Sequence, residues 1–430
     1  MTSHPTELHT DHHSLPGPDD IHREVLPNGI VILARSNFSS PSVTVSGYIQ
    51  AGSLMDPEDK LGLADFATSA LMRGTGRHSF DELYNDLEAV GASLGFDSGM
   101  NSTGFHAHAL VEDLPLVLNL LSETMREPTF PRSEVEKLRH HLLTGLAIRE
   151  QDTADMADIT FDEILYSGHP YARVEDGNPT TIKAITRGDL VKYHRRAFGP
   201  SGMVIVVVGA VKPERAAAAV RRALGSWKNS NQQRLPVLPP VKLLRRTVKR
   251  HHPIAGKSQS DLIIGTNGPR RMDPDFLAAS LGNSVLGQFG MMGRIGKAVR
   301  ETSGLAYYAY SNLSAGIGPG SWTVSAGVNP SNVRKATDIV IAELEQFVKD
   351  GVRPEELEDS QANFIGRLPL SFESNAGVAG ALINMERYGL GLDYYRRYDG
   401  QVRSVTRDEV LDVARKYIDP QRLAIAIAGP

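Results

Sequence analysis

The sequence predicts an α+β fold built from two homologous halves, each with helices packed on sheets. Two segments that lie 220 residues apart resemble each other in order and class of residues. A polar and then Pro-rich stretch separates the halves. Strand and helix patterns occur in blocks that do not alternate strictly as βαβ units, which favours α+β over a doubly wound parallel sheet.

The repeat is the strongest of these observations. Thr186 and Arg187 recur as Thr406 and Arg407, and further matches of identical residues follow without a gap, namely Arg195 with Arg415, Pro200 with Pro420, Ile205 with Ile425 and Gly209 with Gly429. Each copy reads as a helix, a Pro-containing turn and an apolar strand. The two copies therefore predict two halves, each of which ends in a core strand.

The first half opens with a hairpin signal. Asn28-Gly29 is a turn dipeptide between two β-prone runs in residues 25–36, and residues 42–52 predict another strand. Helical periodicity follows at residues 61–72, 79–90, 114–125 and 133–149. These elements predict a sheet with helices packed on it.

The second half repeats this plan. Residues 261–267 predict a strand, residues 274–287 and 293–301 predict helices, and residues 305–313 and 321–329 predict two more strands. Helices follow at 331–349 and from Pro354, where a proline and two glutamates are typical of a helix start. We predict a leader at 1–23, a first domain at 24–228, a linker at 229–250 and a second domain at 251–430. A cleft between the halves is the expected site.

Composition excludes several classes of function. The net charge of −4 gives no general attraction for nucleic acid or for an anionic membrane. The chain has no cysteine, which excludes disulfides, thiol catalysis and thiolate metal sites, so any metal would need histidines and carboxylates.

The N-terminus has neither a basic nor an apolar region, so we predict no secretory signal and a cytoplasmic, soluble protein. The strongest apolar run, residues 203–211, is too short to span a bilayer. Five histidines lie in the polar leader, namely His4, His9, His12, His13 and His22. A disordered tail is the simpler interpretation of this leader, and loose binding of transition metals is the alternative.

Three segments resemble the M16, pitrilysin-like peptidase family. They are GSLMDPEDK with the following GLADFATSALMRGTG, then DPDFLAASLGNSVLG, and finally GRIGKAVRETSGLAYYAYS. The linker and both repeat ends are also similar to that family, so the resemblance extends over nearly the whole chain. It implies a half-length, M16B-type chain of two duplicated α/β sandwiches, with antiparallel sheets, that enclose a peptide.

Active members of the family carry His-x-x-Glu-His on a helix. Residues i and i+4 share a helix face, so the two imidazoles bind zinc while the Glu acts as general base. The resemblance places Asp65, Thr68 and Ser69 at these positions. A neutral hydroxyl is a poor zinc ligand and no general base, so the zinc motif is degenerate.

The third zinc ligand of active relatives is a Glu in a later helix. The corresponding turn here holds Thr144, Gly145 and Leu146, and Glu150 is the nearest downstream acid. With Gly145 at this position we expect no zinc in this chain. The pairs His106 with His108 and His140 with His141 come without a motif, so we interpret them as surface or satisfied histidines.

Arg300 and Tyr307 in the second half resemble the Arg/Tyr pair that family members hold opposite the zinc site. Both are donors suited to negative charge on a carbonyl oxygen. We predict that they contact substrate and oxyanion in trans, with a surface Arg and a core Tyr as the alternative. Strand alternation puts Tyr308 on the face opposite to Tyr307, so only one tyrosine can join Arg300.

The loop at residues 287–296 has a glycine at every third position, namely Gly287, Gly290, Gly293 and Gly296. It lacks the Lys-Ser/Thr of a P-loop and follows a helix, so nucleotide binding is not expected. In non-catalytic relatives a loop at this place handles the substrate peptide, so we predict substrate binding at Gly287, Gly290 and Gly293. A flexible connection between helices is the alternative.

The leading hypothesis is a zinc-less subunit that binds peptide and supplies transition-state contacts to a zinc-bearing M16 partner in a heterodimer. Zinc is expected in that partner only, and the chain is not expected to be catalytic alone. The alternative is a peptide-binding or assembly scaffold, similar to the core subunits of respiratory complexes. Substrate, partner identity and self-association do not follow from the sequence.

Overall fold

The computed structural model describes residues 15–288 and 293–430. Its strands are β1 (His22–Val25), β2 (Val31–Ser36), β3 (Ser42–Ile49), β4 (Ser93–Ser98), β5 (Thr103–Leu110), β6 (Val204–Gly209), β7 (Val248–Pro253), β8 (Ser260–Asn267), β9 (Ala306–Leu313), β10 (Ser321–Val328) and β11 (Ala424–Gly429).

The helices of the first half are α1 (Leu63–Ser69), α2 (Phe80–Ala89), α3 (Leu114–Arg126), α4 (Arg132–Arg149), α5 (Thr153–Leu165), α6 (Pro179–Ala184), α7 (Arg187–Ala197) and α8 (Pro213–Leu224). Those of the second half are α9 (Phe276–Gly287), α10 (Gly293–Ile295) with a π-helical continuation η7 (Gly296–Thr302), α11 (Val333–Asp350), α12 (Pro354–Arg367), α13 (Asn375–Arg387), α14 (Tyr394–Ser404) and α15 (Arg407–Tyr417).

Five strands are arranged in the same order in the two halves, and the first sheet has β1 as an additional edge strand, which agrees with the repeat. The first sheet has the order β1-β2-β6-β3-β5-β4 and the second has the order β7-β11-β8-β10-β9. The expected antiparallel pairing is found with one exception in each half. The last strand of each copy, β6 or β11, pairs parallel with β2 or β7, because the chain returns to the sheet through helices rather than through a hairpin.

The predicted hairpin at Asn28-Gly29 joins β1 to β2. Val25 pairs with Val31, and Gly29 adopts a φ of 90°, in the left-handed region that glycine tolerates best. The Asn28 amide donates to the carbonyl of Leu224 at 3.0 Å, at the end of α8. The turn therefore also ties the hairpin to the helix that covers it.

Each sheet packs one face on helices of its own half. In the first half the buried core joins the sheet to helices α1, α3 and α8, and in the second half it joins the sheet to α9, α11 and α15. Asn283 fixes α9 from inside, since its Oδ1 accepts from Ser311 Oγ at 2.7 Å and from Trp322 Nε1 at 2.9 Å. These layers confirm the predicted α+β class.

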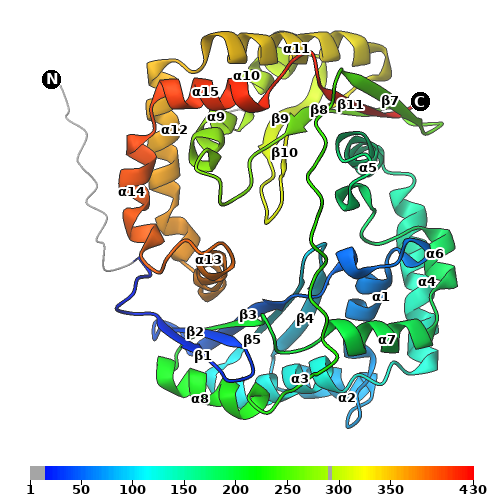
Figure 1. The fold of residues 1–430 in the computed structure, drawn as a ribbon, viewed down its shortest axis with the longest axis vertical. Coiled ribbons are helices and arrows are strands. Elements are labelled where there is room, and N and C mark those ends of the chain that lie inside the picture. Colours follow the sequence, from blue (N-terminus) through cyan, green and yellow to red (C-terminus); the bar gives the residue numbers. More distant parts are fainter. Residues whose placement is uncertain (1–14, 289–292) are drawn as a thin grey trace.

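The other face of each sheet is covered by a helix from the opposite half. Helix α5, from the first half, packs on β8 and β11, and Phe161 is buried there against Ala426. Helix α13, from the second half, packs on β3 and β6, and Leu382 is buried there against Val206. Figure 1 shows this exchange, with α5 beside the upper sheet and α13 beside the lower one.

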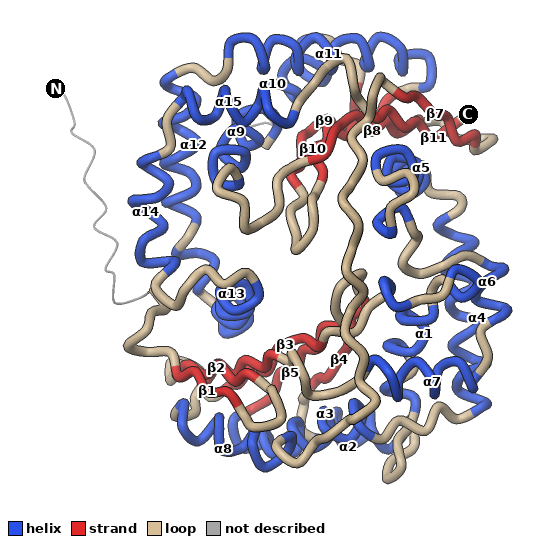
Figure 2. Tube along the Cα trace, viewed as in Figure 1, coloured by secondary structure: helices blue, strands red, loops and turns tan. Residues whose placement is uncertain are grey.

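The segment between α8 and β7 carries no helix or strand and crosses between the halves as an extended chain, drawn in tan in Figure 2. At the other end of the first half, residues 15–23 are described and belong to the folded structure, ahead of the predicted domain start at residue 24. Leu15 and Ile21 are buried, and β1 begins at His22. The leader prediction therefore included residues that belong to the fold. Among the described residues, no helix is both long and apolar enough to cross a membrane.

Candidate functional site

Helix α1 carries the three positions of the degenerate zinc motif, and a buried carboxylate fixes its start. Asp56 accepts from the backbone N–H of Gly62 at 3.1 Å and of Ala64 at 3.0 Å. Burial raises the pKa of Asp56 to about 7, although these backbone hydrogen bonds oppose the rise. The DPEDK lead-in thus caps the helix, as an acid at the positive end of a helix dipole does.

The three motif positions differ in where their side chains lie. Asp65 is half-buried, whereas Thr68 is buried and its Oγ1 lies 3.2 Å from that of Thr103. Ser69 is half-buried and makes no side-chain hydrogen bond to a described residue. Asp65 is the one carboxylate of this helix, and the hydroxyl of Thr68 is already bonded to Thr103.

Gly145, at the position of the third ligand, lies on the exposed side of α4. A Cβ added to Gly145 would meet no atom within 4 Å. In the part of the chain that the structure describes, no group of three or more His, Asp or Glu side chains is arranged to hold a metal. The ligand set that the family motif requires is therefore not assembled by Asp65, Thr68, Ser69 and Gly145.

Carboxylates of α1, of α5 and of the loop before α6 lie close together, which sequence reasoning missed. Burial, followed by the charge of Asp176, raises the pKa of Asp65 to about 6. Burial also raises the pKa of Asp162 to about 7, with Asp158 and Glu175 adding to the rise. We call Asp65, Asp158, Asp162, Glu175 and Asp176 the acidic wall.

The acidic wall lies beside the free edge of the first sheet. Strand β4 is the last strand of that sheet, and a Cβ on Gly99, directly after β4, would lie 4.0 Å from Glu175 Oε2. Arg149 from α4 pairs with Asp176 and also donates to the carbonyl of Gly177 at 3.1 Å. Within the wall Asp176 is thus partly neutralised, whereas Asp65 and Asp162 form no ion pair with a described residue.

In the second half, a further acid, Asp261 on β8, lies between the acidic wall and β9, the strand that carries Tyr307 and Tyr308. Its carboxylate is buried and accepts from Thr153 Oγ1, from Gln259 Nε2 at 3.1 Å and from Tyr308 Oη. Burial, and then the hydrogen bond to Asp261, raise the pKa of the Tyr308 hydroxyl. Tyr308 therefore faces α5, inside the molecule.

Tyr307 lies at an irregularity of β9. Tyr308 pairs with Gly327 but Ala306 pairs with Val328, so Tyr307 is an extra residue in the ladder. Its side chain is 85% exposed and makes no hydrogen bond to a described residue. The sequence predicts opposite faces for Tyr307 and Tyr308 from the alternation of side chains along a regular strand. The bulge interrupts that alternation at Tyr307.

Arg300 lies in the π-helical turn η7, which directly precedes β9. Its side chain is half-buried and forms no ion pair or hydrogen bond with any described residue. The structure therefore leaves both Arg300 and Tyr307 without partners inside the described chain, on neighbouring segments of the second half.

The described glycines of the predicted substrate loop pack closely. A Cβ on Gly287 would lie 2.2 Å from the backbone nitrogen of Ser311, and one on Gly293 would lie 2.8 Å from the nitrogen of Gly287. Gly293 also has a φ of 63°. Close approach of α9 to β9 thus explains Gly287, and close approach of α10 to α9 together with the positive φ explains Gly293, while Gly290 lies outside the described residues.

The histidine pairs have ordinary partners or face solvent. His106 Nδ1 lies 3.2 Å from Asp97 Oδ2, His108 Nδ1 lies 3.4 Å from Thr44 Oγ1, and His140 Nδ1 lies 2.7 Å from the carbonyl of Glu136. His141 is exposed. This agrees with their interpretation as surface or satisfied side chains.

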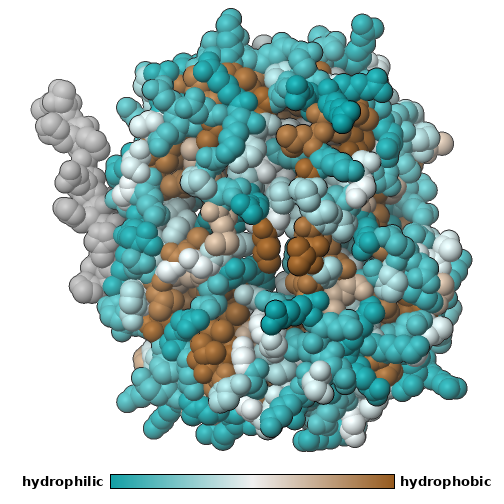
Figure 3. Space-filling view, in the orientation of Figure 1, coloured by the Kyte–Doolittle hydropathy of each residue, from teal (hydrophilic) through white to brown (hydrophobic). Residues whose placement is uncertain are grey.

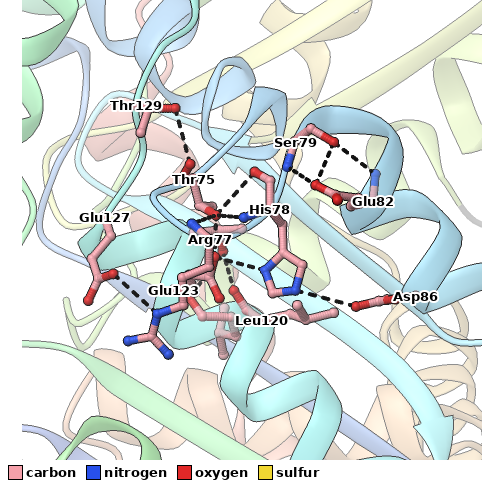
Figure 4. A network of polar contacts seen from close by, with 12 residues as sticks. Thr75, Arg77, His78, Ser79, Glu82, Asp86, Leu120, Glu123, Glu127 and Thr129 are labelled. Atoms are coloured by element: carbon pink, nitrogen blue, oxygen red, sulfur yellow. Dashed lines mark hydrogen bonds and ion pairs between the residues drawn. The ribbon is translucent and has the colours of Figure 1, made fainter.

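A further polar network lies after α1, and sequence reasoning missed it too. His78 Nδ1 lies 2.9 Å from Glu123 Oε1 and its Nε2 lies 3.5 Å from Asp86, while Thr75 also donates to Glu123 (Figure 4). Burial would raise the pKa of Glu123, but the hydrogen bonds from Thr75 and His78 outweigh it and lower that pKa. The network anchors the turn at residues 74–79 to α3, so we assign it a structural role.

Two family models match the chain. The model described as "Insulinase (Peptidase family M16)" matches residues 31–172, and the one described as "Peptidase M16 inactive domain" matches residues 184–364. The degenerate motif on α1 lies in the first match, and Arg300 and Tyr307 lie in the second. The inactive-domain match supports a non-catalytic member of the family.

Curated relatives include a protein named as a zinc protease and a subunit of a respiratory complex. An uncharacterized zinc protease of Mycobacterium tuberculosis is 27% identical over 413 residues, which cover 95% of this chain and 93% of the relative. Subunit 1 of the human mitochondrial cytochrome b-c1 complex is 25% identical over 67% of this chain and 59% of that subunit.

Solved structures show the same fold. A peptidase M16 inactive domain from Pseudomonas fluorescens superimposes with a TM-score of 0.89 at 24% identity, covering 96% of this chain and 98% of that chain. A protease from Helicobacter pylori also gives 0.89, at 19% identity, covering 97% of this chain and 100% of that chain. With both sequence models and the duplicated sheets in agreement, the chain belongs to the M16 peptidase family.

Proposed function

We propose that this protein is a zinc-less subunit of a two-chain M16 peptidase, in which it binds peptide and contributes Arg300 and Tyr307 to a zinc-bearing partner. The observation that carries the proposal is the state of these two side chains. Both lack partners in the described chain, and Tyr307 is 85% exposed at the start of the edge strand β9. Donors without intramolecular acceptors are available to a substrate carbonyl or its oxyanion.

Two features support a peptide as the substrate. Strands β4 and β9 each end their sheet, so each has one edge with backbone groups that do not pair with another strand of that sheet. An extended peptide can add to such an edge through main-chain hydrogen bonds. The acidic wall beside β4 favours peptides with lysine or arginine side chains, because opposite charges attract in a half-buried site.

We propose that the partner subunit, and not this chain, binds the metal. Asp65 is the one charged group among the four motif positions, and a single carboxylate does not make a zinc site. We therefore propose no cofactor in this chain and a heterodimer with an M16 subunit that carries intact His-x-x-Glu-His. The proposed location is the cytoplasm.

The test is reconstitution with that zinc-bearing subunit and an unstructured Lys/Arg-containing peptide. We expect Arg300→Ala or Tyr307→Phe to lower kcat about a hundredfold, while assembly and the zinc content of the complex stay unchanged, because a lost oxyanion donor affects the transition state most. Matched controls are Arg334→Ala on the exposed side of α11 and Tyr84→Phe on α2. Tyr308→Phe is unsuitable as a control, since Tyr308 donates to the buried Asp261.

A scaffold role is the second candidate, and the similarity to cytochrome b-c1 complex subunit 1 favours it. The same experiment separates the two. Unchanged kcat in both variants, with the complex intact, would remove Arg300 and Tyr307 from the mechanism and leave a protein that binds or assembles without a part in catalysis.

A further inference from the structure

A pocket of about 340 Å³ lies among α9, α12 and α14, at the end of the edge strand β9. Known small-molecule pockets span roughly 300–1,000 Å³, so this one has room for a single small group. Its walls include Phe276 and Leu277 of α9, Phe364 and Arg367 of α12, and Tyr394 and Tyr398 of α14.

The charged side chains of this pocket are both arginines. Arg271 and Arg367 line it, and no Asp or Glu of the described chain does. Neither arginine forms an ion pair with a described residue, and Arg271 makes one side-chain hydrogen bond, from Nη2 to the hydroxyl of Tyr394 at 3.0 Å. Arg367 is exposed, and the Nε and Nη1 atoms of Arg271 remain accessible. Both guanidinium groups therefore keep donors for an anionic ligand.

Aromatic rings fix the charged ends of both arginines at the pocket wall. The guanidinium carbon of Arg271 lies 4.3 Å from the centre of the Phe276 ring, and that of Arg367 lies 4.2 Å from the centre of the Phe364 ring. Both rings line the pocket. Such stacking holds a guanidinium by its face and leaves the N–H groups at its edge available to donate.

Two tyrosine hydroxyls add neutral donors. The hydroxyl of Tyr394 accepts from Arg271, so its own hydrogen can be donated to a ligand. The hydroxyl of Tyr398 makes no hydrogen bond to a described residue. Burial, and then the neighbouring Tyr394, raise the pKa of Tyr398 to about 12, while the charges of Arg367 and Arg271 oppose the rise. Both positive charges therefore act at the hydroxyl of Tyr398.

The rest of the lining suits an apolar group beside the anion, since Leu277 and Leu313 join the aromatic rings there. The face of the molecule drawn in Figure 3 is mainly hydrophilic, and its apolar side chains lie in separate patches. An apolar ligand group therefore needs a recess lined by several such side chains to lose much of its contact with water.

The repeat explains why an acid is missing from this pocket. Helix α9 follows β8 as α1 follows β3, and α12 is the second helix after β10 as α4 is after β5. Arg149 ends α4, where it pairs with Asp176, whereas Arg367 ends α12 without a carboxylate partner in the described chain. At this place the first half supplies its own acid, and the second half leaves an arginine for the acid of a ligand.

We propose that this pocket binds the C-terminal carboxylate of a peptide whose last side chain is apolar, with Arg271 and Arg367 as the charged donors. The inference rests on the proposed peptide-binding role and names the end of the peptide that is recognised. Leu313 is the last residue of β9, so a peptide that adds parallel to this edge strand carries its C-terminus toward the pocket. Charge-assisted hydrogen bonds to a carboxylate are roughly twice as strong as neutral ones.

The test is isothermal titration of the full chain with an unstructured, lysine-containing peptide that ends in phenylalanine, prepared as the free acid and as the C-terminal amide. We expect the acid to bind at least about tenfold more tightly than the amide, because the amide carries no charge. 3-Phenylpropanoate has the same carboxylate and ring without a peptide backbone. It should bind at least about tenfold more weakly than the peptide acid, since it cannot add to β9.

Arg367→Gln removes one charge from an exposed side chain and should lower the preference for the acid about tenfold, with binding of the amide unchanged. The matched control is Arg334→Gln on the exposed side of α11, which should keep the preference. Arg271→Gln should act as Arg367→Gln does. If Arg271→Gln fails to fold by circular dichroism, Arg367→Gln decides the matter alone.

Equal binding of acid and amide, or equal behaviour of Arg367→Gln and Arg334→Gln, would overturn this inference and leave the proposed binding of peptides in place. Equal affinities of 3-phenylpropanoate and the peptide acid would also overturn it, because the pocket would then take small free carboxylates. Failure of both peptides to bind would contradict the inference and the proposed peptide-binding role together.

Discussion

At the scale of single residues, Thr68, one of the predicted motif positions, is fixed by the packing of α1. It is 2% exposed, and Thr103, its hydrogen-bond partner, donates in turn to the carbonyl of Ala51 at 2.9 Å. The pair ties α1 to the start of β5. A Glu at residue 68 would replace this buried contact with a charge that needs its own partner.

The predicted ligand positions can be tested by restoring the zinc ligands through mutation. We expect the triple variant Asp65→His, Thr68→Glu, Ser69→His to show little peptide cleavage, because the metal would have only two protein ligands. Adding Gly145→Glu should raise zinc content, since the position has open space for a side chain.

Both variants should be prepared without residues 1–14, which hold four histidines, and zinc should be measured by elemental analysis. Gly145→Ala in the triple background is the matched control. Strong chelator-sensitive turnover from the triple variant alone would show that the third ligand lies elsewhere, and Glu150 would be examined first.

The acidic wall predicts a pH dependence of stability. The pKa of Asp162 is raised from 3.8 to about 7, so between these values the folded state holds a proton that the unfolded state has released. Stability therefore falls as the pH rises through this window, and the cost is complete above pH 7. We expect Asp162→Asn to increase the free energy of unfolding by about 1–2 kcal/mol at pH 7.5 and to change it little near pH 4, measured by urea denaturation.

Asp155→Asn, on the same helix but exposed, serves as the control and should have a smaller effect. An equal gain from Asp162→Asn at both pH values would show that packing, rather than the charge of the wall, is responsible.

At the scale of elements, a glycine in the interior of α4 and one at the end of α9 should respond in opposite ways to substitution by alanine. Gly145 is exposed in the interior of α4 and a Cβ would meet nothing, so Gly145→Ala should stabilise the protein by about 0.5–1 kcal/mol. Gly287→Ala should destabilise it, because the new Cβ would lie 2.2 Å from the nitrogen of Ser311. Thermal unfolding of both variants tests this, and a loss of stability in Gly145→Ala would indicate a contact made by that face of α4.

The sequence predicted the elements whose periodicity arises from packing on their own sheet. Helices α2, α3 and α4 begin and end within one or two residues of the expected ranges. Helices α5 and α13 were not separately predicted. Both contact the sheet of the opposite half, and their short apolar faces, around Phe161 and Leu382, carry no signal of that distant partner.

The candidate site was predictable only in part, for the same reason. The motif positions on α1 and the pair Arg300 and Tyr307 could be predicted because a family pattern includes them, and their roles stay predictions. The acidic wall could not be found, since Asp65, Asp162 and Glu175 are far apart in the sequence and carry no shared motif. Nor does the sequence show the bulge at Tyr307, which arises from a register shift against Gly327 and Val328.

At the scale of the whole molecule, the exchange of α5 and α13 couples the stability of the two halves. Each sheet has one face covered by its own helices and the other covered by a helix that belongs to the opposite half. Neither half can therefore bury both faces of its sheet alone, and a domain that exposes such a face loses much of its apolar burial. The linker adds a covalent connection and a few contacts of its own, whereas the exchanged helices bury whole apolar faces.

This coupling can be tested with the two tryptophans, since Trp227 is buried in the first half and Trp322 in the second. Single-tryptophan variants, Trp227→Phe and Trp322→Phe, should each give a urea transition by fluorescence that coincides with the transition of the same variant by circular dichroism. Adding Leu382→Ala should lower the free energy of unfolding by about 2–5 kcal/mol in both backgrounds, because Leu382 belongs to the second half but packs on the first sheet. Two separate transitions, or a Leu382→Ala effect seen by only one tryptophan, would show that the halves unfold independently despite the exchanged helices.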